Sequence, residues 1–214
     1  MDTRTVVIIP AAMIVLMIGG SAFALASLPS DALVPIHFNL SGKPDSFAHP
    51  LVAFSLLPAV ATVVVVITAL VARRPDVRST AGFRVAVLAP FTVLAVTHAL
   101  LIAYTLGIEV NVTRILVLVS GLVLVVTGNV LGKIRPNRWV GIKTPWTLRD
   151  ERVWDRTHRF GGWIFVGAGT ALALSAIVLP AGPVLGAILF ATLAVVVIVP
   201  SVKSYLLWRE RQNV

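Results

Sequence analysis

The chain has 214 residues, of which 57% are hydrophobic and only 13% are charged, and its mean hydropathy is +0.94. Soluble globular domains are about half apolar and about a quarter charged, so this composition indicates a membrane protein and excludes an ordinary soluble domain. The formal net charge is +9, and the chain contains no cysteine, which excludes disulfides, thiolate metal sites and cysteine nucleophiles.

The apolar residues fall into six windows that are long enough to cross a membrane, which takes about 20 residues as a helix. We therefore expect an all-α membrane protein with six transmembrane helices. The first window ends beside the A-x-A sequence of residues 24–26, so it also resembles a secretory signal peptide, although its length favours a retained anchor. The predicted spans are Val6–Leu28, Leu51–Ala72, Val85–Leu106, Ile115–Leu131, Trp163–Leu179 and Val184–Leu207.

The basic residues predict the orientation of these spans. In a six-span arrangement, 16 of the 18 Lys and Arg residues fall on one side, and only Lys43 and Arg114 fall on the other. By the positive-inside rule, both termini are predicted to be cytoplasmic, in a multi-pass protein of the cell membrane. The charge is then mostly topological, so we expect the lipid bilayer as a partner, no direct binding of nucleic acid and no cofactor. The 16 residues are Arg4, Arg73, Arg74, Arg78, Arg84, Lys133, Arg135, Arg138, Lys143, Arg149, Arg152, Arg156, Arg159, Lys203, Arg209 and Arg211.

The segment LPSDALVPIHFNLSGKPDSFAHP, residues 28–50, forms the predicted outer loop between the first two spans. Its four prolines exclude a continuous helix and favour an ordered, turn-rich loop, in which Gly42 is free to take a positive φ. His37, Asp45 and His49 could be interpreted as metal ligands. Because no closely spaced histidine pair is present, we interpret them as hydrogen-bonding loop residues and predict no metal site.

The segment GNVLGKIRPNRWVGIKTPWTLRDERVWDRTHRFGGW, residues 128–163, forms the predicted inner loop between spans four and five. Its G-x-x-x-G start allows another helix to approach closely. A solvated, positively charged loop would account for its charge and tryptophans, but not for its concentration of turn-forming residues. The positions that topology leaves unexplained, and that we therefore treat as a candidate site, are Gly128, Asn129, Gly132, Arg135, Pro136, Asn137, Gly141, Thr144, Pro145, Trp146, Thr147, Trp154 and His158.

A short helix is also predicted inside this inner loop. Thr147 followed by Asp150 resembles a capping box, so we expect a helix to begin at Leu148. Tryptophans before, in and after this helix are typical of the headgroup level of a bilayer. The sequence thus predicts a short amphipathic helix that lies along the inner membrane surface.

Polar residues are rare inside the predicted spans. His98 lies near the middle of span three, and Thr105 and Glu109 are expected on the same helical face toward the outer surface. Ionisable residues inside a membrane suggest function, although a neutral histidine hydrogen-bonded to a neighbouring span is the favoured interpretation. The fifth span carries small residues that predict a helix-packing face, namely Gly167, Ala171 and Ser175.

The two polar segments resemble the SdpI/YfhL family of bacterial membrane immunity proteins. The inner segment resembles the family's defining motif, and the outer segment resembles the N-terminal module common in that family. The resemblance implies an N-terminal two-span module over residues 1–78 and a four-span module over residues 79–214. It also implies a protein that is not an enzyme, that protects against a secreted killing peptide and that can recruit a cytosolic repressor. The outer-loop residues expected to meet the peptide are Pro35, His37, Phe38, Asn39, Gly42, Pro44 and Asp45.

Two other functions remain open from the residues alone. A small-solute or proton-coupled transporter could use the polar face of His98, Thr105 and Glu109. A membrane enzyme could use Asp155 and His158, which are three residues apart, but ion pairs on a helix surface produce the same spacing. The sequence contains no nucleophile elbow, phosphate-binding loop or zinc-ligand helix, so the enzyme is the least favoured hypothesis.

Overall fold

The computed structural model describes residues 5–29, 31–73 and 81–212, which form six long helices and one two-stranded antiparallel sheet. Arg4, Arg74 and Arg78, which contributed to the predicted orientation, lie outside the described residues. The elements in chain order are α1 (Thr5–Ser27), β1 (Val34–Phe38), β2 (Pro44–Ala48), α2 (Pro50–Val71), α3 (Ala81–Thr105), α4 (Val112–Leu131), α5 (Glu151–Val178) and α6 (Pro183–Gln212).

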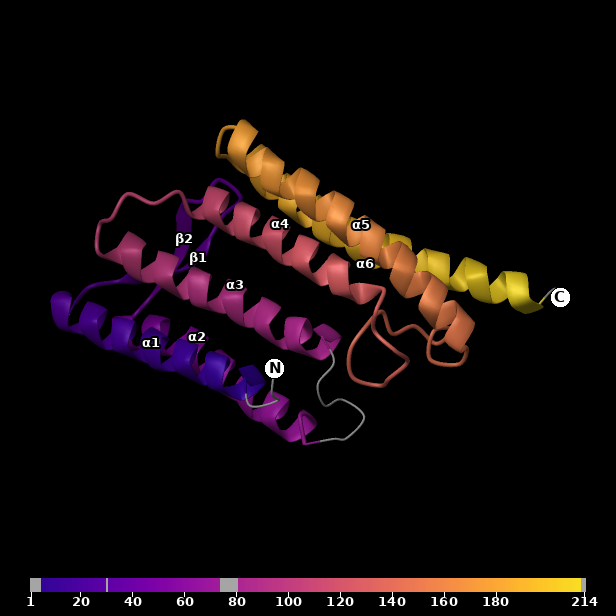
Figure 1. The fold of residues 1–214 in the computed structure, drawn as a ribbon. Helices are drawn as coiled ribbons and strands as arrows, with labels where there is room; N and C mark the ends of the chain where they lie inside the picture. The colour runs from indigo at the N-terminus through magenta and orange to yellow at the C-terminus, as the bar shows by residue number, and fades with distance from the viewer. Residues whose placement is uncertain (1–4, 30, 74–80, 213–214) are drawn as a thin grey trace.

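The prediction of six apolar helices is confirmed, because all six are long and apolar enough to cross a membrane. They lie side by side as a bundle, with α1, α2 and α3 on one side and α4, α5 and α6 on the other (Figure 1). The start of α1, the α4–α5 connection and the end of α6 lie at one end, which we call the inner end. The β hairpin lies at the opposite, outer end (Figure 1).

The outer loop differs from the predicted all-α fold, because residues 34–48 form a β hairpin. The Asn39 side chain accepts hydrogen bonds from the backbone N–H groups of Ser41 and Lys43, and Gly42 has the predicted positive φ, at 75°. These contacts close a tight turn that brings the two flanking segments together. The strands were not evident from the sequence because each has only five residues and contains a proline, which weakens the strand pattern.

The predicted separate helix beginning at Leu148 is wrong, because residues 145–149 are turns and α5 runs without a break from Glu151 to Val178. The Asp150 side chain accepts hydrogen bonds from the N–H groups of Arg152 and Val153, so Asp150 is the N-cap instead of Thr147. A helix of 28 residues is about 42 Å long, whereas the hydrocarbon layer is about 30 Å thick. The first turns of α5 can therefore extend beyond the hydrocarbon while the rest crosses it.

The predicted polar face on span three is also wrong at one position, because α3 ends before Glu109. Gly107 has φ of 75°, and the N–H groups of Gly107 and Ile108 bond to the carbonyls of Tyr104 and Ala103. This Schellman motif stops the helix and leaves Glu109 exposed in the connection to α4. A contiguous stripe from His98 to Glu109 does not form.

Helices α4 and α5 pack together through two glycine pairs. A Cβ on Gly121 would lie 2.7 Å from the Gly169 carbonyl oxygen, and a Cβ on Gly128 would lie 2.7 Å from the Gly162 carbonyl oxygen. The backbones therefore touch at two levels. The small-residue face predicted for span five is wrong, because a Cβ on Gly167 would meet nothing within 4 Å. The glycines and alanines buried on α5 are Gly161, Gly162, Gly169, Ala173 and Ala176.

Candidate functional site

The inner segment is folded around the buried side chain of His158. Its Nε2 accepts a hydrogen bond from the Ile142 N–H at 2.9 Å, and its Nδ1 lies 2.9 Å from the Trp154 carbonyl oxygen. The first bond requires an unprotonated Nε2 and the second requires a protonated Nδ1. These contacts therefore fit the neutral tautomer that carries its proton on Nδ1. His158 therefore fixes the loop to α5 through backbone groups.

Gly141 lies directly against this histidine. Its φ is 127°, and a Cβ there would collide with His158 Nε2 and come within 3.0 Å of the Trp154 ring. Trp154 is fully buried, stacks on His158 with centroids 4.0 Å apart, and donates from Nε1 to the Ile134 carbonyl oxygen at 2.7 Å. Only glycine fits both the backbone conformation and the space at position 141.

The Thr144-Pro145-Trp146 stretch contacts the last turns of α6. Thr144 Oγ1 lies 3.0 Å from Ser204 Oγ, and both residues are buried. The Trp146 ring packs against Tyr205, with centroids 5.1 Å apart, and also approaches Trp208. Thr147 Oγ1 donates to the Ile142 carbonyl oxygen and Pro145 is exposed in the turn. The inner loop thus links α5 to α6.

Other predicted inner residues occupy the surface of this loop. The Asn137 side chain accepts from the N–H groups of Trp139 and Val140 and donates to the Arg135 and Val140 carbonyl oxygens. Arg135 and Pro136 are exposed. Asn129 is exposed on α4 and its Nδ2 donates to the Val125 carbonyl oxygen of the same helix. Most of the inner motif therefore holds the loop in shape, and few of its side chains remain available to a partner.

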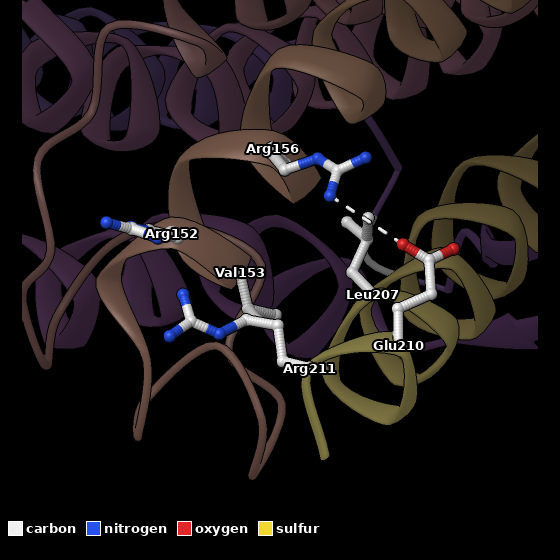
Figure 2. A pocket seen from close by; sticks show the side chains of 6 residues that line it. All are labelled: Arg152, Val153, Arg156, Leu207, Glu210 and Arg211. Carbon is white, nitrogen blue, oxygen red and sulfur yellow. Dashed lines mark ion pairs between the residues drawn. The ribbon is translucent and has the colours of Figure 1, made fainter. Parts of the chain in front are cut away.

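A basic groove lies beside this loop, between the start of α5 and the end of α6 (Figure 2). Its volume is about 450 Å³, and its residues are Arg152, Val153, Arg156, Leu207, Glu210 and Arg211. Arg156 Nη1 lies 3.7 Å from Glu210 Oε2, as Figure 2 shows, and Arg211 Nε lies 3.0 Å from Asp150 Oδ2. Of the three guanidinium groups, two are paired with the carboxylates of Glu210 and Asp150, so the groove keeps a net positive charge above an apolar floor of Val153 and Leu207.

The outer hairpin carries an exposed His–Asp pair. His37 Nδ1 lies 2.5 Å from Asp45 Oδ1 across the two strands. His49, the third residue considered for a metal, instead accepts from the Leu51 N–H at the start of α2. Within the described ranges, no group of three or more His, Cys, Asp or Glu residues is placed to hold a metal.

The hairpin turn rests on the outer ends of α4 and α6. A Cβ on Gly42 would meet Thr113 Oγ1 at 2.5 Å, and a Cβ on Gly186 would meet the Leu40 carbonyl oxygen at 2.7 Å. Phe38 packs edge-to-face on Tyr104 of α3, with centroids 5.2 Å apart. Pro35 is buried and Pro44 half-buried in the strands.

An outer groove lies between this turn and the helices. It has a volume of about 450 Å³ and an apolar wall, with the His–Asp pair at its edge. Its lining residues are His37, Phe38, Asn39, Leu40, Asp45, Val112, Thr113, Leu116, Gly186, Leu189 and Phe190.

His98 is buried inside the bundle, as expected of a histidine that bonds to a neighbouring span. Its Nε2 lies 2.9 Å from Ser21 Oγ and 3.1 Å from the Met17 carbonyl oxygen, both on α1. The Thr105 hydroxyl donates to the Leu101 carbonyl oxygen of its own helix. These contacts join α1 to α3 and do not continue toward Glu109.

Several residues of these sites were missed from the sequence. Ser204, Thr113 and Ser21 each meet a predicted site residue from a distant part of the chain, and Gly186 meets Leu40 beside the predicted outer-loop residues. All four are small or polar residues within or beside predicted spans. A small or polar residue in an otherwise apolar helix is the sequence feature that could have indicated these positions. The residue that each one contacts could not be inferred without the arrangement of the helices.

Known protein families match two parts of the chain, one that includes the outer loop and one that includes most of the inner segment. Residues 133–204 match the SdpI/YfhL protein family, and residues 12–62 match a domain of unknown function, DUF1648. The chain is 39% identical over 70 residues to "Immunity protein SdpI" of Bacillus subtilis (strain 168). That alignment covers 33% of this chain and 34% of the relative, so the chain spans about a third of the length of the curated relative that it matches. No solved structure matches.

Proposed function

Because residues 133–204 match the SdpI/YfhL family, we propose that the chain is a membrane immunity protein that protects the cell against a secreted killing peptide. The observation that carries this proposal is the 39% identity to an immunity protein over 70 residues, together with the family match over residues 133–204. The proposal includes the predicted orientation, with the hairpin outside the cell and both termini in the cytoplasm.

The outer groove is the proposed contact for the peptide. Its apolar wall, which includes Leu189 and the 61%-exposed Phe190, suits hydrophobic side chains of a membrane-active peptide. The exposed His37 and Asp45 at its edge can form hydrogen bonds to the peptide's polar groups. The groove combines residues of the predicted N-terminal and four-span modules, which explains why both would be needed for one activity.

The basic groove at the inner end is the proposed contact for a cytosolic repressor. Arg152, Arg156 and Arg211 present positive charge around an apolar floor, which favours an acidic and partly apolar protein surface (Figure 2). Binding of the peptide outside would then be reported to gene expression by a change at this end.

The transporter alternative receives no support from a specific contact. His98 bonds to Ser21 and Met17, and Glu109 lies beyond the end of α3. The polar path that the alternative requires is interrupted between these two residues.

The proposal is tested by expressing the full chain in a sensitive bacterium and adding a secreted killing peptide of the kind that SdpI-type immunity proteins resist. We expect survival with the wild-type chain, reduced survival with His37→Ala/Asp45→Ala and unchanged survival with Arg138→Gln at the inner end. The proposed function is contradicted if the expressed chain protects the cells from no such peptide and the peptide causes no change in gene expression.

A further inference from the structure

We propose that a second groove, between α4 and α5 at the inner end, binds the phosphate headgroup of an anionic phospholipid. We call it the glycine groove. Its volume is about 290 Å³, its floor is formed by Gly128, Gly132 and Gly162, and Lys133, Arg159 and Trp163 stand around it. The inference is independent of peptide immunity, since it concerns only how the protein meets its membrane.

The glycines make this groove because they bring the helices together and leave space beside them. The backbones touch at Gly128 and Gly162, where a Cβ would lie 2.7 Å from the facing carbonyl oxygen. One turn further, the three atoms nearest to a Cβ on Gly132 all belong to Arg159, at 3.4 Å or more, and Gly132 is exposed. The cavity therefore opens to the outside of the bundle next to tightly packed helices.

The two cations at this groove have no counter-ion among the residues that the structure describes. Lys133 on the α4 side and Arg159 on α5 are exposed, and in the described part of the chain neither takes part in an ion pair or a side-chain hydrogen bond. Asp155 lies four residues before Arg159 on α5 and forms no ion pair with it among those residues. The basic groove differs in this respect, because Arg156 and Arg211 are each paired with a carboxylate. A phosphate diester can accept hydrogen bonds from both unpaired cations at once.

The position of the groove along the bundle favours a lipid over a soluble anion. Trp163 follows Arg159 by four residues and is 79% exposed, which is typical of a tryptophan at the headgroup level. Val166 lines the groove one turn deeper, at the start of the apolar part of α5. The groove thus offers cations for a headgroup and an apolar continuation for an acyl chain, which a free phosphate cannot use.

The test uses the full chain, purified in detergent with equal amounts of phosphatidylcholine and phosphatidylglycerol, and measures the lipids retained per protein by mass spectrometry. Lys133→Gln/Arg159→Gln should lower the retained phosphatidylglycerol-to-phosphatidylcholine ratio by about thirtyfold, because two basic residues at about 1 kcal/mol each contribute about 2 kcal/mol to such binding. Gly132→Leu should lower it similarly by filling the cavity without changing the charge. The control Arg138→Gln/Arg209→Gln removes the same charge at the same end and should change the ratio less than about twofold, because neither residue lines the glycine groove.

Three results would overturn the inference. An equal loss in the control pair would mean diffuse attraction to the basic end. An unchanged ratio in Gly132→Leu would mean that the cavity is not the site. Release of phosphatidylglycerol by inorganic phosphate at millimolar concentration would mean a site for free anions.

Discussion

Single residues of the inner segment act mainly through backbone contacts. His158 uses both ring nitrogens for the Ile142 N–H and the Trp154 carbonyl, and Asp150 uses its carboxylate to cap α5. The sequence could indicate that these residues are unusual, because turn formers and tryptophans concentrate there. It could not show what they do, since each partner lies in a part of the chain whose position depends on the whole fold.

Replacement of Gly141 should be costly although no polar contact is lost. Gly141→Ala should destabilise the protein by about 1–3 kcal/mol, because the alanine Cβ collides with His158 and a φ of 127° strains any residue with a side chain. Thermal unfolding of the purified protein in detergent measures this. Gly167→Ala is the matched control, since its Cβ would meet nothing within 4 Å and should leave stability unchanged or slightly higher.

The packing of α4 against α5 was predicted only in part from the sequence. The G-x-x-x-G pattern correctly suggested a close helix approach at Gly128, but α4 uses Gly121 and Gly128, seven residues apart, against Gly169 and Gly162. The partner face on α5 was predicted wrongly, because several small residues occur on that helix and spacing alone cannot select a face. Apolar windows predicted the six helices well, since length and hydropathy are local properties.

The β hairpin is an element whose position depends on contacts with distant helices. Its turn lies against Thr113 of α4 and Gly186 of α6. The sequence predicted the turn at Gly42, but it could not predict where the hairpin lies relative to these helices. The two helix residues that contact the turn, Thr113 and Gly186, lie about 70 or more positions further along the chain. The outer groove exists only because the hairpin rests there.

Displacing the hairpin should expose Thr113, which is 9% exposed in the intact fold. In a Thr113→Cys background, Gly186→Val should accelerate labelling by a water-soluble maleimide, because the valine collides with the Leu40 backbone. The chain has no native cysteine, so labelling reports this position alone. Gly182→Val, at a position with open space, serves as the control, and equal rates in both variants would show that Gly186 does not hold the hairpin in place.

At the scale of the whole molecule, six helices that are long and apolar enough to cross a membrane separate two surfaces. The hairpin and outer groove lie at one end, and the α4–α5 connection and the basic groove lie at the other (Figure 1). The distribution of charge predicts which end faces the cytoplasm, because the basic residues gather at the inner end. Signalling across the membrane would require that peptide binding at the outer groove changes the structure of the basic groove.

Labelling of intact cells checks this orientation. A cysteine introduced as Ser41→Cys in the hairpin should react with an impermeant maleimide in whole cells, because Ser41 is exposed and predicted to face outward. Arg138→Cys, exposed in the inner loop, should react only after the cells are permeabilised. The reverse pattern would place the hairpin in the cytoplasm.

Photo-crosslinking to the killing peptide tests the central claim, that the outer groove recognises this peptide, most directly. A photoreactive benzoylphenylalanine replaces Phe190, which is exposed in the outer groove, or Leu148, which is 53% exposed in the inner loop. The account predicts a crosslinked product from position 190 and none from position 148. Crosslinking from position 148 alone, or equally from both positions, would contradict it.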